Sequence, residues 1–234
     1  MANHNIDLPA IHLQSLNTLL EQGVDPNYEP DKGRTLLMMV AQSCMNDYVR
    51  LLLDKGADLN WRNKRGVTAI WGAAGNGCLE TVQLLLERGA EINMPDDEGE
   101  TVLMLASHNG ESEGENYPAI VRLLLECGAA VNHRSEAGWT ALMWASAVGH
   151  ATIARLLVDY GADLNATTDY GLSPLMWAVR SRCGDIVQML VERGADLSIR
   201  DKQGNTAQDW ADDMPVVPNS GLLRLPCPVR SDCD

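Results

Sequence analysis

The sequence predicts an all-α protein built from stacked helix–turn–helix units, and two recurring patterns support this prediction. A glycine followed two residues later by Thr or Ser recurs along the chain, as does a glycine that ends a leucine-rich run. Both series advance by the same steps of 33, 33, 39, 33 and 33 residues. The first series is Gly33, Gly66, Gly99, Gly138, Gly171 and Gly204, and the second is Gly23, Gly56, Gly89, Gly128, Gly161 and Gly194. Such a period is typical of repeat proteins, in which each unit buries its apolar face against its neighbours.

The unit that begins at Gly138 illustrates the elements of every repeat. Gly138 permits a tight turn, and the hydroxyl of Thr140 is expected to cap a first helix with the sequence ALMWASAV. Gly149 ends that helix. A second helix, TIARLLVDY, has one apolar stripe, and Gly161 ends it as a C-terminal cap. A polar, hairpin-like link then leads to the next turn glycine.

These residues resemble the ankyrin-repeat family, in which GxT opens each unit and LLxxGADxN closes it. The closing motif GADLN occurs at 56–60 and 161–165, with the variants GAEIN at 89–93, GAAVN at 128–132 and GADLS at 194–198. The resemblance covers residues 15 to about 213. It implies an elongated, slightly curved solenoid whose hairpin tips and first helices form a concave face that usually binds another protein.

The period also divides the chain into segments. Residues 1–27 keep only the closing half of a unit and are interpreted as an N-terminal capping repeat, followed by five ankyrin repeats over residues 28–200. The third repeat has six extra residues within 110–119, predicted to lengthen the loop between its helices without touching the stacked faces. Residues 201–214 suit a polar C-terminal cap, which solenoids need for solubility. Residues 215–234 are rich in Pro and lose the period, so we expect an irregular or disordered tail.

The repeats depart from the family pattern at the position five residues after each turn glycine, where a histidine usually braces the turn. Here the residues are Met38, Trp71, Met104, Met143 and Met176. A thioether cannot donate a hydrogen bond, so we expect these turns to be held by packing and the hairpins to be mobile. The next position holds Trp144, Trp177 and Trp210. Such a ladder could form an aromatic ligand box, but the family resemblance favours a place in the core.

The chain is acidic, with a formal net charge of −14. The third repeat alone has eight acidic residues, including Glu98, Glu100, Glu111, Glu113 and Glu115, against a single arginine. This cluster could be a solvated surface or an electrostatic contact for a basic partner. The spacing of its glutamates does not match a calcium-binding loop, so we expect no metal.

The charge also argues against nucleic acid as a partner, since phosphate contacts need clustered Lys and Arg. No apolar run has membrane-spanning length, and the N-terminus lacks a signal-peptide pattern. We therefore expect a cytoplasmic protein with no membrane contact.

Cysteines and catalytic motifs offer little sign of chemistry. Cys44, Cys78, Cys127 and Cys183 lie one per unit, so neighbours are predicted to be a repeat apart and too distant for a disulfide. The motifs HExxH, GxSxG and GxxxxGK[ST] are absent from the sequence. The sequence therefore predicts reduced, structural thiols, no enzyme activity and no cofactor.

Binding of another protein is the function that the sequence favours. In the ankyrin fold the residues around each turn glycine and at the end of each first helix point to the concave face. The candidate partner-binding residues are Arg34, Arg65, Glu98, Glu100, His108, Trp139, Asp169, Tyr170, Leu172 and Arg180. Trp139 and Tyr170 are candidate apolar anchors, although Trp139 could instead pack along the adjacent hairpin.

Three hypotheses follow from these residues. The first is a monomeric adaptor or scaffold whose protein partner offers a basic patch and an apolar anchor. The second is an inhibitor or immunity-type neutraliser that blocks a basic enzyme or toxin with the acidic third repeat. The third concerns asparagines that close the hairpins and resemble those hydroxylated in some ankyrin proteins, namely Asn60, Asn93, Asn132 and Asn165.

Overall fold

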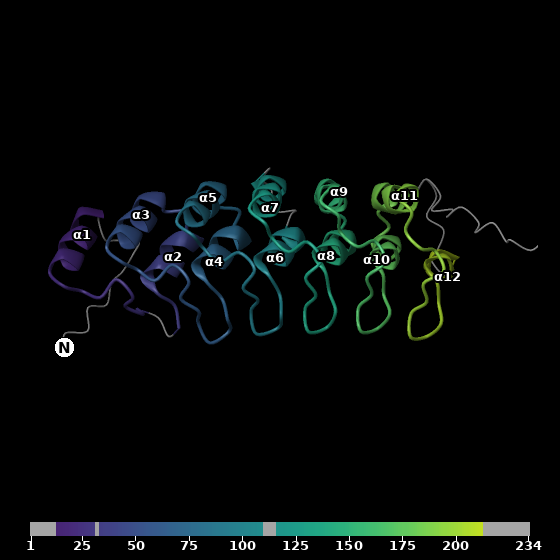
Figure 1. Ribbon diagram of the computed structural model, residues 1–234, viewed down its shortest axis with the longest axis horizontal. Helices are drawn as coiled ribbons and strands as arrows, with labels where there is room; N and C mark the ends of the chain where they lie inside the picture. Colours follow the sequence, from purple (N-terminus) through teal and green to yellow (C-terminus); the bar gives the residue numbers. More distant parts are fainter. Residues whose placement is uncertain (1–12, 31–32, 110–115, 213–234) are drawn as a thin grey trace, which may run out of the picture. The chain divides into compact units, whose positions relative to one another are not determined.

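The computed structural model describes residues 13–30, 33–109 and 116–212. Within these residues the regular structure consists of twelve α-helices and no strand, which confirms the all-α prediction. The chain divides into two compact units, Met1–Ala130 (unit 1) and Val131–Asp234 (unit 2). Each unit has helices in two rows, formed by the first and the second helices of its repeats (Figure 1).

Unit 1 begins with α1 (Leu13–Glu21), which lies in the predicted N-terminal cap; residues 1–12 of that cap lie outside the described residues. Three helix pairs follow. The first helices are α2 (Leu36–Gln42), α4 (Ala69–Gly75) and α6 (Val102–His108), and their second helices are α3 (Asn46–Asp54), α5 (Leu79–Glu87) and α7 (Asn116–Glu126). The hairpin-like links extend from the side of the first helices (Figure 1).

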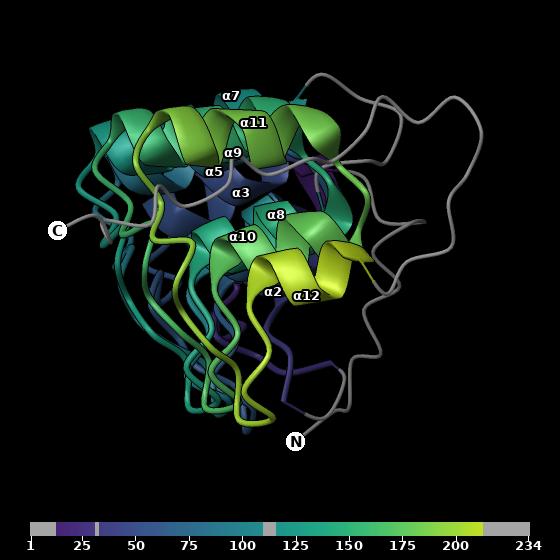
Figure 2. The same ribbon diagram turned by 90° about the vertical axis from the view of Figure 1, so that its right-hand side faces the viewer.

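Unit 2 has two complete helix pairs and a final short helix. The first helices are α8 (Ala141–Val148), α10 (Pro174–Arg180) and α12 (Ala207–Asp212), and the second helices are α9 (Ala151–Asp159) and α11 (Gly184–Glu192). Figure 2 shows α8, α10 and α12 side by side, with α9 and α11 forming the other row. The predicted tail, residues 215–234, lies outside the described residues.

The hydroxyl caps expected at the first helices are confirmed in four of the repeats. The side chains of Thr35, Thr101, Thr140 and Ser173 accept a hydrogen bond from the backbone N–H three residues further on. Thr68, which precedes α4, is buried but makes no such bond. Each cap satisfies one of the N–H groups that a helix leaves unpaired at its start.

The methionines that replace the family histidine fill the core, as the sequence predicts. Met38, Met104, Met143 and Met176 are buried, whereas Trp71 is half-buried. Their flexible side chains occupy the space between the two helix rows. The remaining core consists mainly of leucines and alanines, together with valines and isoleucines.

The prediction that the hairpins are held by packing alone is wrong. Three residues before five of the six turn glycines, Gly33 excepted, a short polar side chain accepts a backbone N–H from within its own hairpin, which closes the turn. These side chains belong to Asn63, Asp96, Ser135, Thr168 and Asp201. Side-chain hydrogen bonds therefore supply the bracing that the missing histidine would have given.

Hydrogen bonds also join successive repeats through the asparagines that close the hairpins. In unit 1 the Oδ1 atoms of Asn27, Asn60 and Asn93 accept a backbone N–H from the next repeat, 2.7–3.0 Å away. In unit 2 Asn132 and Asn165 do the same. These bonds link each hairpin to the next one and so help to fix the spacing of neighbouring hairpins.

That the six extra residues within 110–119 lengthen the loop between the helices stays a prediction. Residues 110–115 lie outside the described residues, but α7 already begins at Asn116. Tyr117 is only 5% exposed, and its hydroxyl donates to the Gly75 carbonyl over 3.0 Å. Asn116 donates its Nδ2 hydrogen to the carbonyl of Gly77, 2.9 Å away. The start of α7 thus contacts the preceding repeat at the end of α4 and the turn that follows it.

The prediction that the cysteines are too far apart to pair is also wrong. Cys44 and Cys78 form a disulfide, with their Cα atoms 5.2 Å apart. Helix axes pack about 8–10 Å apart, but the turns between helices of successive repeats come closer. The sequence separation of 34 residues, one more than the period, places the start of one second helix beside the preceding turn. Cys127 and Cys183 are free, and Cys227 and Cys233 lie outside the described residues.

Candidate functional site

The candidate residues of unit 1 lie on three successive hairpins and on α6. Arg34, Arg65, Glu98 and His108 are exposed, and Glu100 is half-buried. The hairpin tips are in direct contact, because the N–H of Asp97 donates to the carbonyl of Arg65 over 3.1 Å. Unit 1 therefore presents a basic hairpin tip, with Lys64 and Arg65 exposed, beside an acidic one.

The acidic hairpin is held in a fixed conformation by Asp96. One carboxylate oxygen of Asp96 accepts the backbone N–H groups of Glu98 and Glu100, each over 2.9 Å. The side chain of Glu98 is left exposed at the surface. Glu111, Glu113 and Glu115, which complete the predicted acidic cluster, lie outside the described residues. Inhibition of a basic enzyme through this repeat stays a prediction.

Three tryptophans of unit 2 form a contiguous aromatic cluster, the tryptophan cluster, comprising Trp139, Trp144 and Trp177. The rings of Trp139 and Trp144 stack, with centroids 4.0 Å apart and planes 21° from parallel. The ring of Trp177 lies 4.5 Å from that of Trp139, tilted by 34°. Trp139 comes from a hairpin and the other two from α8 and α10, so the cluster spans two repeats.

The interpretation of the tryptophan ladder as core is correct only in part, because Trp144, Trp177 and Trp210 are half-buried, while the indole Nε1 atoms of Trp144 and Trp177 are buried. The buried residues of α8 are Ala141, Leu142, Met143, Ala145 and Ser146, whereas Trp144, Ala147 and Val148 are partly exposed. Spacings of three and four residues place these last three on one helix face. Trp144 and Trp177 therefore lie on the outer face of the first-helix row.

The alternative interpretation of Trp139, packing along the adjacent hairpin, stays a prediction, because its ring partners come from α8 and α10. Its ring packs on Trp144 and Trp177, yet the residue is half-exposed. Pairs of this kind contribute about 0.5–1.5 kcal/mol beyond the area they bury. The cluster is therefore a preorganised aromatic surface, whose rings lose little freedom when a ligand binds.

Cationic side chains flank aromatic rings in unit 2. The guanidinium carbon of Arg180, an exposed residue, lies 5.2 Å from the ring centroid of Trp177. The Lys202 ammonium lies 5.6 Å from the ring of Tyr170, which is 64% exposed. Both distances permit a cation–π attraction. Backbone bonds from Asp169 N–H to Ala137 and from Lys202 N–H to Tyr170 connect these hairpins.

The prediction that Leu172 contributes to the exposed surface is wrong, since only 9% of this residue is accessible. Its backbone closes the hairpin: the Leu172 N–H donates to the Thr168 hydroxyl, and its carbonyl accepts the Thr168 N–H. The side chain of Leu172, directly before the capping Ser173, is therefore directed into the protein. Asp169 and Tyr170, at the hairpin tip, are exposed as expected.

The residues that sequence reasoning missed are Trp144, Trp177 and Lys202. The signal for the two tryptophans was their spacing of one repeat, which suggested an aromatic ligand box before the family resemblance favoured the core. A count of the helical positions would have placed them on the outer face. No sequence signal places Lys202 over Tyr170, since that contact depends on the packing of successive hairpins.

The described residues offer no metal centre. Within 13–30, 33–109 and 116–212, His, Cys, Asp and Glu side chains do not gather in groups of three or more that could hold an ion. No helix among these residues is both long and apolar enough to cross a bilayer. The asparagines of the hydroxylation hypothesis have their Oδ1 atoms in hydrogen bonds between repeats, and that hypothesis stays a prediction.

A comparison with protein-family models identifies the repeats. The model described as ankyrin repeats (3 copies) matches residues 10–96, 62–114, 73–167 and 111–201. The chain belongs to the ankyrin-repeat family. Ankyrin repeats generally mediate protein–protein interactions and are typically non-catalytic. Among curated proteins, none matches the sequence significantly.

Proposed function

We propose that this chain is a non-catalytic protein-interaction module, an adaptor or scaffold, and that unit 2 binds its partner through the tryptophan cluster. The observation that carries this proposal is the stack of three half-buried, partly accessible indole rings with Arg180 beside it. Trp, Tyr and Arg are the residue types most enriched where binding energy is concentrated. A surface of this kind is costly to expose without a partner.

The surroundings of the cluster indicate the chemistry of that partner. An apolar side chain of the partner would cover the rings of Trp139 and Trp177, since burial of apolar area is the main source of affinity. The guanidinium carbon of Arg180 lies over the ring of Trp177, and guanidinium N–H groups suit a carboxylate or a carbonyl. Tyr170, exposed at the neighbouring hairpin tip, would extend the same contact.

The experiment selects peptides from a random displayed library on the immobilised full-length chain and measures the affinity of each selected peptide in solution. Trp139→Ala and Arg180→Ala are the test variants. Tyr160→Ala and Arg155→Ala are matched controls, because both residues are exposed but lie in or directly after α9 of the second-helix row. Circular dichroism establishes that each variant keeps its helix content.

We expect Trp139→Ala to weaken binding about thirtyfold, the effect of a contact contributing about 2 kcal/mol. Arg180→Ala should reduce the binding affinity by a smaller factor than Trp139→Ala, and the two control variants should leave the affinity unchanged. Selected peptides that bind Trp139→Ala as tightly as the wild type, and lose affinity only for the α9 controls, would place the binding surface on the other helix row and refute the proposal.

A further inference from the structure

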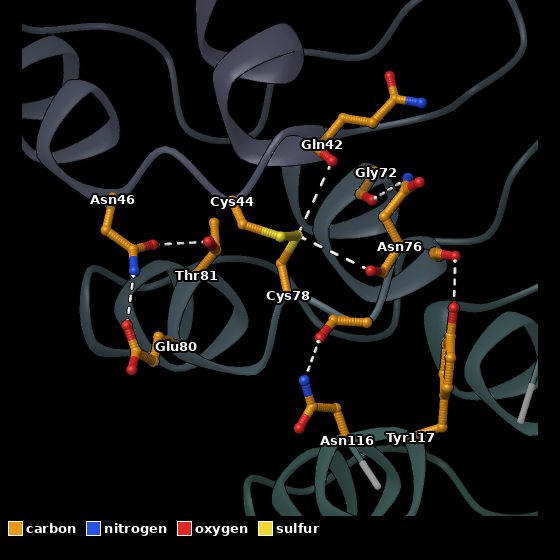
Figure 3. The surroundings of a disulfide bond; sticks show 12 residues. Gln42, Cys44, Asn46, Gly72, Asn76, Cys78, Glu80, Thr81, Asn116 and Tyr117 are labelled. Carbon is orange, nitrogen blue, oxygen red and sulfur yellow. Dashed lines mark hydrogen bonds between the residues drawn. A yellow bond between two sulfur atoms is a disulfide. The ribbon is translucent and has the colours of Figure 1, made fainter. Parts of the chain in front are cut away.

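The disulfide in unit 1 joins the turns of two successive repeats. Cys44 follows the C-terminal end of α2, and Cys78 is the residue directly before α5 (Figure 3). Cys44 has a left-handed backbone with φ 56°. The corresponding residues of two other repeats are glycines, Gly77 with φ 70° and Gly149 with φ 99°. A side chain at this position is therefore unfavourable for the backbone, but it brings the sulfur of Cys44 to Cys78.

The two cysteine residues differ in their exposure to solvent. Cys44 is exposed, whereas Cys78 is only 4% exposed. Thiol–disulfide exchange needs a thiolate to approach one sulfur of the bond from outside. Cys44 is the sulfur that a dissolved thiol can reach, and Cys78 is the one that leaves.

The surroundings of Cys78 also suit a reduced thiol. The sulfur of Cys78 lies 3.8 Å from the carbonyl oxygen of Gln42 and 4.0 Å from that of Asn76. A thiol at Cys78 could donate a weak hydrogen bond to these oxygens.

Beside the disulfide a polar network joins the same two repeats (Figure 3). The Thr81 hydroxyl donates to Asn46 Oδ1 over 2.6 Å, and Asn46 Nδ2 donates to Glu80 over 2.9 Å. Contacts of this kind, together with the packing of α2 on α4, would keep the repeats stacked after the disulfide opens.

We propose that Cys44 and Cys78 form a redox clamp, a reversible disulfide that stabilises the stacking of the first two helix pairs of unit 1. A glutathione thiolate attacks the Cys44 sulfur, forming a mixed disulfide and releasing the Cys78 thiolate, which takes up a proton. A second glutathione attacks the glutathione sulfur of the mixed disulfide and releases Cys44. The net reaction converts two glutathione thiols into glutathione disulfide while the protein disulfide becomes two thiols, and oxidation is the reverse.

The clamp is local to α2–α5. The bonded residues are 34 apart in sequence, so the closed loop contains α3, one hairpin and α4. Closing the loop restricts the states in which this segment is open or unfolded. Unit 2 supplies an internal reference, because its corresponding residues, Gly149 and Cys183, cannot form a disulfide.

The test uses the full-length chain with Cys127, Cys183, Cys227 and Cys233 replaced by Ser, so that only the clamp cysteines remain. Hydrogen exchange with mass spectrometry is recorded for the oxidised and glutathione-reduced protein. We expect exchange in α2–α5 to become about tenfold faster or more after reduction, with α8–α11 unchanged. The same protein carrying Cys44→Ser should exchange at the reduced rate under both conditions.

Equilibration with glutathione buffers, followed by alkylation and mass measurement, provides the second test. The clamp should pass from disulfide to dithiol within the range of ratios that glutathione buffers cover, and the mixed disulfide should be found on Cys44. A pair that stays oxidised in excess reduced glutathione would be a permanent cross-link and would overturn the proposal. Equal exchange in α2–α5 for both forms, or two alkylated thiols in air-oxidised protein, would overturn it as well.

Discussion

The indole N–H of Trp210 donates to Oδ2 of Asp201 over 2.9 Å, which ties α12 to the hairpin that precedes it. The other oxygen of Asp201 accepts the N–H groups of Gln203 and Asn205, each within 2.9 Å. Asp201 is buried, so its removal would leave several donors without an acceptor. These bonds hold the end of the described repeat stack in unit 2 together.

Replacing Asp201 with Ala should destabilise the final hairpin and α12. Hydrogen bonds to a charged acceptor contribute about 1.5–3 kcal/mol, so we expect a loss of about 3 kcal/mol. That loss corresponds to roughly hundredfold faster amide exchange in α12. Asp169→Ala is the control, because Asp169 is exposed at the tip of the preceding hairpin. Equal exchange in both variants would contradict this role of Asp201.

The stability of this region should decrease in acid. Burial of Asp201 disfavours its charged form, but hydrogen bonds from Asn205, Trp210 and Gln203 outweigh that effect and lower its pKa. Backbone and side-chain hydrogen bonds from Thr206 lower the pKa of Asp209. A carboxyl whose pKa falls on folding stabilises the fold above its unfolded pKa of about 3.9. The contribution is lost as the pH falls through the folded pKa.

The measurement is urea unfolding of the wild type and Asp201→Asn between about pH 7 and about pH 3. The difference in free energy of unfolding between the two proteins should shrink as the pH falls, since protonation removes the charge that the variant already lacks. A difference that is constant over this range would show that the charge of Asp201 contributes nothing.

Gly171→Ala should destabilise the fold more than Gly204→Ala. Both glycines have left-handed backbones, with φ 81° and 89°. The conformational cost of adding a side chain, about 1 kcal/mol, is therefore the same in both variants. A Cβ at Gly171 would lie 3.0 Å from the Arg200 carbonyl oxygen and 3.0 Å from the Asp201 Cα. A Cβ at Gly204 would have no neighbouring atom within 4 Å. Urea unfolding should show an extra loss of about 1–3 kcal/mol for Gly171→Ala, and equal losses would count against close packing of the hairpins.

Gly149→Cys should form a new disulfide with Cys183. A Cβ at residue 149 would lie 2.5 Å from the Cys183 sulfur, which can rotate to form the bond. The position corresponds to Cys44, and the loop closed is of similar length, so a stabilisation of about 2–4 kcal/mol is expected. A mass loss of two hydrogens and a rise in melting temperature that dithiothreitol abolishes would check it. Free thiols at both residues after air oxidation would show that the turns are farther apart.

Periodic features of this protein could be predicted from the sequence. The two glycine series define the helix ends, and all twelve of these glycines have positive φ in the structure. Thr35, Thr101, Thr140 and Ser173 cap the first helices as expected. Local features of this kind depend on backbone sterics and on hydrogen bonds between neighbouring residues, which the residue order alone specifies.

Contacts between repeats depended on the tertiary structure. The sequence placed Cys44 and Cys78 too far apart, Trp144 in the core and Leu172 at the surface, whereas the structure joins the two cysteines, leaves Trp144 half-buried and buries Leu172. The period indicates which residues of different repeats are equivalent. It does not indicate how close two turns come to each other, or which face of a short helix is buried by its neighbours. Those outcomes follow from the packing of one repeat on the next, in which displacements of a few ångström decide whether a side chain is bonded, buried or available to a partner.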